Sequence, residues 1–159
     1  MTGQASGSPQ SQTTNPPAGT PAIVDVTIEP TATGISVSHE WRWHNGPSEG
    51  KGTIGVPQRA DDEDGTPIHF HLHDNTGRQL RFADDVLGAI WVKRDGCPTS
   101  KCGDSEIPED KIQRAPNLLK VFNENSEECT LHYRLRFIDK NGQSDSYDPD
   151  ITNGGKGRI

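Results

Sequence analysis

Apolar residues are scarce in this chain of 159 residues, at 29%, and aromatic residues make up only 6%. No apolar run approaches the roughly 20 residues that cross a membrane. The N-terminus also lacks the basic and apolar segments of a secretory signal. We therefore expect a soluble, cytoplasmic protein. The apolar residues that are present fall in short alternating runs, a pattern that predicts a folded domain with a thin core.

Charge is missing from the first twenty residues, which also contain no aromatic residue and no Leu, Ile or Val. Such a composition cannot offset the entropy lost when a chain becomes ordered. We predict a disordered tail over residues 1–21, a folded domain over 22–155 and a flexible C-terminus over 156–159. The net charge of −7 therefore lies outside the predicted N-terminal tail, on an acidic body. Bulk electrostatics then argue against nucleic acid or an anionic membrane as a partner.

Cysteine is also rare, with three residues, and an odd count leaves at least one thiol unpaired in a monomer. Cys97 and Cys102 are candidates for a loop disulfide, for a zinc site with Cys129 and His132, or for free thiols. Cys129 and His132 are an odd number of residues apart, so a regular strand points them to opposite faces. This spacing argues against the zinc site. Reduced thiols would fit a cytoplasmic location.

Alternation of apolar and polar residues predicts β-strands along most of the domain. The clearest pattern lies in segment 118–138, which predicts a long hairpin with a polar turn at 123–128. The second arm of this hairpin places four large apolar side chains on one face: Leu131, Tyr133, Leu135 and Phe137. Further strands are predicted at 22–29, 34–43, 53–56, 67–73, 79–82, 87–93 and 144–147, with 67–82 forming a second hairpin.

These seven to nine short strands, with turn residues between them, predict an all-β fold. No long segment has helical periodicity, and only one helical turn is expected within the irregular stretch 94–116. We predict an antiparallel Greek-key β-sandwich of immunoglobulin-like type. A jelly roll is the alternative.

Three histidines alternate with apolar residues on the predicted strand 67–73, and they are His69, His71 and His73. Successive imidazoles on one face of a strand lie about 7 Å apart. A pair of them binds zinc or copper where a neighbouring strand adds a third ligand. The alternative is that they are solvent-facing residues of a half-exposed strand. The cupin metal motif also needs a downstream Glu and a second His block, and neither is present.

No catalytic signature is found. The chain lacks a G-x-S-x-G turn, and nothing in the sequence brings a cysteine to a histidine as a nucleophile and its base. We therefore expect a non-enzymatic interaction or assembly module. Sheet edges pair readily with other chains, so self-association through an edge or binding of a protein partner is expected. The alternative function is that of a transition-metal-binding protein using the strand histidines.

The order of several short motifs resembles that of small uncharacterised bacterial β-sandwich proteins. These motifs are FHLHDNTGRQLRF, AIWV, a Cys-Pro before a second Cys, YRLRFID and DPDITNGG, and the similarity covers about residues 67–155. The resemblance implies a β-sandwich and a bacterial origin, and it carries no assigned activity. Within it, Cys97 and Cys102 match the family's cysteine pair. The three strand histidines match no family position.

Overall fold

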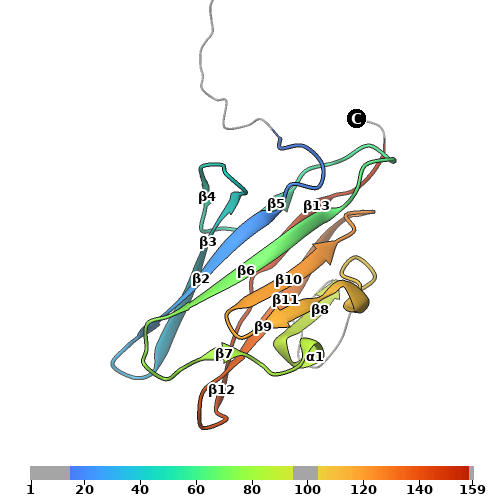
Figure 1. Cartoon of the computed structure of the whole chain (residues 1–159). Helices are drawn as coiled ribbons and strands as arrows, with labels where there is room; N and C mark the ends of the chain where they lie inside the picture. Colours follow the sequence, from blue (N-terminus) through green and yellow to red (C-terminus); the bar gives the residue numbers. More distant parts are fainter. Residues whose placement is uncertain (1–14, 95–103, 158–159) are drawn as a thin grey trace, which may run out of the picture.

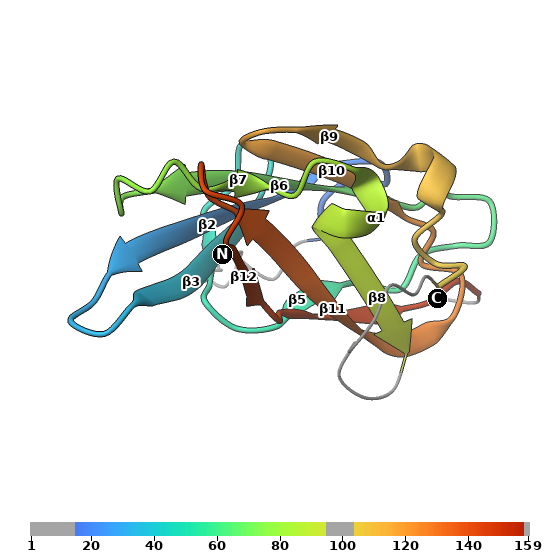
Figure 2. The same ribbon diagram turned by 90° about the horizontal axis from the view of Figure 1, so that it is seen from below.

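The computed structural model describes residues 15–94 and 104–157 of the chain. Two β-sheets pack face to face, as Figures 1 and 2 show. The first sheet has the strand order β4–β3–β2–β6–β10–β9. The bounds of these strands are Ser48–Gly50 (β4), Ile35–Trp43 (β3), Ala22–Pro30 (β2), Thr66–Asp74 (β6), Leu118–Asn123 (β10) and Gln113–Ala115 (β9).

The second sheet is built around the long strand β11 (Glu128–Ile138). On one side, β11 pairs with β13 (Asp150–Gly154) and β12 (Ser144–Tyr147), and β13 continues to β5 (Ile54–Val56). On its other side, β11 pairs with β8 (Ile90–Arg94) and β7 (Arg81–Phe82). Helical structure among the described residues is confined to α1 (Val86–Ala89) and the 3-10 turn η2 (Glu109–Lys111).

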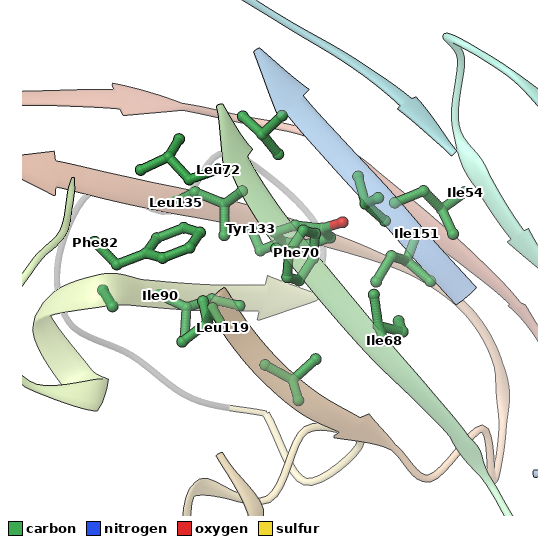
Figure 3. Packing of buried hydrophobic residues seen from close by; sticks show 14 of the residues in the cluster. Ile54, Ile68, Phe70, Leu72, Phe82, Ile90, Leu119, Tyr133, Leu135 and Ile151 are labelled. Carbon is green, nitrogen blue, oxygen red and sulfur yellow. The ribbon is translucent and has the colours of Figure 1, made fainter. Parts of the chain in front are cut away.

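The core lies between the sheets and takes every second residue of the long strands. The buried residues that β2, β6 and β11 contribute to the core cluster are Ala22, Val24, Val26, Ile28, Ile68, Phe70, Leu72, Leu131, Tyr133, Leu135 and Phe137. The rings of Phe70 and Tyr133 come from opposite sheets and meet edge to face, with centroids 5.4 Å apart (Figure 3). Burial of each such side chain contributes about 1.5–3 kcal/mol. The predicted all-β sandwich is therefore confirmed, together with the inward face of each of these strands.

Both sheets are mixed. Most neighbours are antiparallel, but β2 is parallel to β6 and β5 is parallel to β13. A parallel pair needs a long connection, and the chain between β2 and β6 forms three other strands. The prediction of purely antiparallel pairing is wrong at these two pairs. The finer assignment to an immunoglobulin-like or jelly-roll topology stays a prediction.

The predicted hairpin over 118–138 is wrong in its pairing. β10 pairs with β6 and β9 in the first sheet, whereas β11 belongs to the second sheet. Segment 123–128 therefore crosses the sandwich from one layer to the other. Asn123 and Asn125 within it are fully buried, although the sequence predicted a polar hairpin turn here.

Two further predicted strands are corrected. The hairpin over 67–82 does not form, because β7 leaves the first sheet and pairs with Phe137 and Ile138 of β11. The predicted interior strand 87–93 begins as helix α1, capped by the Asp85 side chain, which accepts from the Gly88 N–H at 2.6 Å. Its strand part, β8, pairs with β11 alone among the described strands.

The connections between the strands also differ from the predictions. The helical turn expected in 94–116 is η2, but strand β9 follows it and was missed, as was β13 within the DPDITNGG motif. Residues 1–14 of the predicted tail and residues 158–159 lie outside the described residues. Residues 15–21 lie against the domain, since Arg59 Nη1 donates to the Pro16 carbonyl at 2.8 Å and the His44 N–H donates to the Pro21 carbonyl at 2.9 Å.

Candidate functional site

The three strand histidines lie on the outer face of the first sheet, as predicted. The β6 residues between them face the core, and β2 runs parallel alongside, with Ile23, Asp25 and Thr27 opposite the histidines. His69 and His71 are half-buried and His73 is exposed. We refer to His69, His71, His73 and Asp25 as the histidine face.

Asp25 is the charged centre of the histidine face. One carboxylate oxygen lies 2.9 Å from His73 Nε2, and the other accepts from Arg42 Nη1 at 2.5 Å. Burial would raise the pKa of Asp25, but the hydrogen bonds from His73 and Arg42 outweigh it and hold the pKa below its ordinary value of 3.8. Asp25 is therefore an ionised acceptor that joins β2, β3 and β6.

The other two histidines favour the neutral state. Burial lowers the pKa of His69 below its ordinary value of 6.5, and the positive charge of Lys120 on β10 acts in the same direction. Burial also lowers the pKa of His71, although Asp25 opposes the change. Neutral imidazole is the form that binds metal ions.

Metal coordination by these residues stays a prediction. Within residues 15–94 and 104–157, no group of three or more His, Cys, Asp or Glu side chains is arranged to hold a metal ion. His73 and Asp25 touch each other, and His71 lies opposite Asp25 in the strand register. The neighbouring strand therefore supplies the acidic residue that a third ligand would require, but Arg42 also binds it.

Two of the three cysteines in the cysteine predictions lie outside the described residues. Cys97 and Cys102 lie outside the described residues, so neither their disulfide nor their zinc site is tested. Cys129 is a free thiol that packs against the core, and burial raises its pKa. His132 points to the other face of β11, where its Nδ1 lies 2.8 Å from Asp150. The opposite orientation of Cys129 and His132 agrees with their odd spacing.

The first sheet has one long open edge, along the first half of β3. β4 pairs with β3 only at Trp41 and Arg42, and no other described strand pairs with β3 on that side. The segment Ile35–His39 therefore borders no described strand except β2. Figure 1 shows the β2–β3 hairpin extending past β4.

The register shows which backbone groups this edge presents. The Thr31 N–H donates to the Gly34 carbonyl, and antiparallel pairs alternate between bonded and non-bonded along the ladder. Ser36 and Ser38 consequently bond to β2, while the N–H and C=O groups of Ile35, Val37 and His39 point away from it. The Ile28 carbonyl accepts from the Asn75 N–H on the β6 side of β2, so it points away from Val37, as this alternation requires.

The other described edges are short, interrupted by a bulge or charged. β4, β5 and β9 have three residues each, and β4 follows a bulge in β3. Charges lie on two other edges, at Asp145 on β12 and at Lys93 and Arg94 on β8. Residues 121–123 of β10 extend past β9 by three residues only. Charge, short length and bulges protect sheet edges from pairing with other chains. The open segment of β3 contains no Lys, Arg, Asp, Glu or Pro, so it lacks this protection.

A buried polar junction at one end of the sandwich was missed by the sequence analysis. Asn123 and Asn153 exchange two amide hydrogen bonds, of 2.7 and 2.9 Å, between β10 and β13. Glu106 is 1% exposed and accepts from the Ser126 and Glu127 N–H groups. Because all these donors and acceptors are satisfied inside the protein, the junction is structural: it fixes the crossing between the sheets.

Comparison of the chain with protein-family models and with curated proteins found no match. The resemblance to bacterial β-sandwich proteins therefore stays a prediction. No helix in the described part of the chain is long and apolar enough to cross a membrane.

Proposed function

We propose that this protein is a non-enzymatic interaction module that accepts a β-strand at the open edge of β3. The observation that carries the proposal is the unprotected segment Ile35–His39, whose outward backbone groups border no described strand. Strand addition uses such groups for affinity and the adjoining side chains for specificity. The end of the edge is held in place, because His39 Nδ1 lies 2.5 Å from the Tyr147 hydroxyl and its Nε2 lies 2.8 Å from the Gly52 carbonyl.

The occupant that fits this edge is the same strand of a second copy. An antiparallel pair of β3 strands with Val37 opposite Val37 aligns outward N–H groups with outward carbonyls. Ser36 then lies opposite Ser38, so no like charges meet, and like charges directly opposite would be unfavourable. The contact would join two six-stranded sheets about a two-fold axis. Each net hydrogen bond contributes only about 1 kcal/mol, so the association is expected to be weak and concentration-dependent.

Proline substitution tests the edge directly. Val37→Pro removes an N–H that points away from β2, so the β2–β3 ladder keeps its hydrogen bonds. We expect the variant to sediment as a monomer at concentrations where the wild type associates. The matched control is Ser146→Pro on the edge of β12, where the alternation of β11–β12 pairs also turns the N–H outward. Unchanged association of Val37→Pro, or equal loss in the control, would count against the β3 edge.

A charge exchange tests whether the occupant is a second copy. Changing Ser36 and Ser38 to Lys in one protein, and to Glu in another, places like charges opposite each other in each self-pair. We expect each variant to be monomeric alone and a one-to-one mixture of the two to associate. A wild type that remains monomeric at high concentration in sedimentation equilibrium would remove self-association.

A second candidate function is transition-metal binding at the histidine face. It is favoured by the contact of His73 with Asp25 and by the position of His71 beside them. Arg42→Gln would free Asp25, and we expect it to strengthen zinc or copper binding, whereas Asp25→Asn would weaken it. Isothermal titration and elemental analysis of untagged protein measure this. Wild-type protein that contains no metal and gives no binding heat with either ion would exclude this function.

A further inference from the structure

Arg59 is a buried arginine at the end of the sandwich opposite the β2–β3 turn. Its side chain contacts the segment 15–21 at Pro16, and the residue is only 6% exposed. One guanidinium nitrogen, Nη1, donates to the Pro16 carbonyl at 2.8 Å. Its backbone is held on both sides, since its N–H donates to the Gly155 carbonyl and its carbonyl accepts from the Gly157 N–H. The backbone of Arg59 is therefore held to the segment that follows β13, and the printed guanidinium contact is the bond to Pro16.

The other two guanidinium nitrogens of Arg59 are buried and have no hydrogen-bonding partner among the described residues. They are Nε and Nη2, the pair that forms one flat edge with two parallel N–H groups. The same edge binds a carboxylate in four other arginines among the described residues. These pairs are Arg78 with Asp139, Arg81 with Asp84, Arg94 with Asp104 and Arg134 with Asp148.

A buried guanidinium without an acceptor on this edge is costly, because a charge removed from water needs a partner. The acidic loop beside it does not supply one. Glu63 turns back and accepts from the Ala60 N–H at 2.8 Å, while Asp61, Asp62 and Asp64 are exposed. The arrangement of Arg59 is thus that of a binding residue whose acceptor comes from another molecule.

We propose that the Nε/Nη2 edge of Arg59 binds a small carboxylate anion. A carboxylate has two coplanar oxygens that match two parallel N–H groups. The neighbouring acidic residues repel a multiply charged phosphate more strongly than a monoanion, which favours a monocarboxylic acid. Because both nitrogens are closed to solvent, the ligand enters when the segment 15–21 lifts from Arg59, and the Pro16 contact closes over it afterwards.

Nuclear magnetic resonance of the arginine side chains tests the site. Sodium formate is titrated into full-length protein labelled with nitrogen-15, with sodium chloride at equal ionic strength in a parallel sample. We expect the Nε–H signal that is absent from Arg59→Lys to shift saturably with formate and to stay unchanged with chloride. A ligand of three heavy atoms limits the dissociation constant to the order of 1 mM or weaker. No saturable shift, or an equal shift with chloride, would overturn the proposal.

Urea denaturation distinguishes the binding of an added carboxylate to Arg59 from the binding of Arg59 to an acceptor within the chain. Formate should raise the midpoint of urea unfolding of the wild type and leave that of Arg59→Met unchanged. Arg59→Met should be at least as stable as the wild type in formate-free buffer, because it removes a buried group that lacks an acceptor. If replacing Asp61, Asp62 and Asp64 with Asn moves the Arg59 signal in formate-free buffer, the chain's own loop occupies the edge and the proposal is wrong.

Discussion

The phenol of Tyr133 ends inside the core, where its oxygen has no hydrogen-bonding partner among the described residues. The residue is 1% exposed, and burial raises its pKa well above its ordinary value. The hydroxyl of Tyr147, in contrast, lies 2.5 Å from His39 Nδ1 and remains partly exposed. The two tyrosines of the chain thus differ in whether the hydroxyl has a hydrogen-bonding partner among the described residues.

This difference predicts opposite effects of one substitution. Tyr133→Phe should leave the free energy of unfolding unchanged or raise it by about 1 kcal/mol, because a buried hydroxyl without a partner is unfavourable. Tyr147→Phe should lower it by about 1 kcal/mol through loss of the bond to His39. Urea denaturation of both variants measures the change. A loss of more than about 2 kcal/mol in Tyr133→Phe would show that the hydroxyl has a partner.

The sequence predicted the orientation of individual side chains well but did not predict the buried polar ones. Period-two alternation placed Phe70, Leu135 and the strand histidines on their correct faces. Asn123 and Asn125 looked like turn residues, because Asn is common in exposed turns. Their burial depends on partners far away in the sequence, which are Asn153 for Asn123 and the Pro57 carbonyl and Gly155 N–H for Asn125. No local pattern indicates such distant hydrogen bonds.

At the scale of elements, the DPDITNGG motif forms strand β13 because its glycines allow close backbone contacts. A Cβ added to Gly154 would lie 2.2 Å from the backbone nitrogen of Gln58, and one added to Gly155 would lie 2.6 Å from that of Glu128. Gly155 also has a φ of +81°, a conformation that side chains other than glycine rarely adopt. The motif therefore has a structural role in packing β13 against β5 and β11.

Gly154→Ala should be strongly destabilising. The added methyl group meets backbone atoms that cannot rotate away, and we expect a loss of about 3 kcal/mol or more. Gly142→Ala is the matched control, because this turn glycine has a φ of +82° and nothing within 4 Å of an added Cβ. Its expected loss is about 1 kcal/mol, from backbone strain alone. Equal effects in thermal denaturation would contradict the steric explanation.

Strand existence was easier to predict than strand pairing. Alternation identified β10 and β11 with their faces, but adjacency in sequence suggested a hairpin that does not form. Both strands are apolar on one side, and either arrangement would satisfy that pattern. The crossing at 123–128 is decided by the Asn123–Asn153 bonds and by Glu106, which belong to the folded state only.

For the whole molecule, the ionisable groups predict loss of stability in acid in two stages. His69 and His71 have pKa values below 6.5 in the folded protein, so the unfolded chain binds protons first as the pH falls through 6.5. Asp25 and Asp104 have pKa values below 3.8 in the folded protein, so they add a second loss as the pH falls below about 4. The histidine pair and the aspartate pair therefore both contribute most to the free energy of unfolding near pH 7.

Urea denaturation between pH 7 and pH 3 checks this prediction. Replacing His69 and His71 with Gln should flatten the first stage and leave the second in place. His44→Gln serves as the control: His44 is exposed, and its charge is the smallest of the effects that lower the pKa of His69, so a much smaller flattening is expected. Stability that rises as the pH falls from 7 to 5 would show that the sign of the histidine effect is wrong.

The sequence by itself determined that this chain forms strands, which face of each strand is apolar, and that the domain carries its charge outside a thin core. These properties depend on the period-two alternation of neighbouring residues, which is local information. Only the tertiary structure decided that β10 and β11 lie in different sheets. It also decided that, among the described residues, half of β3 has a neighbouring strand on one side only and that one edge of the buried Arg59 guanidinium has no acceptor. These features depend on which distant backbone and polar groups meet, and many pairings satisfy the same local pattern.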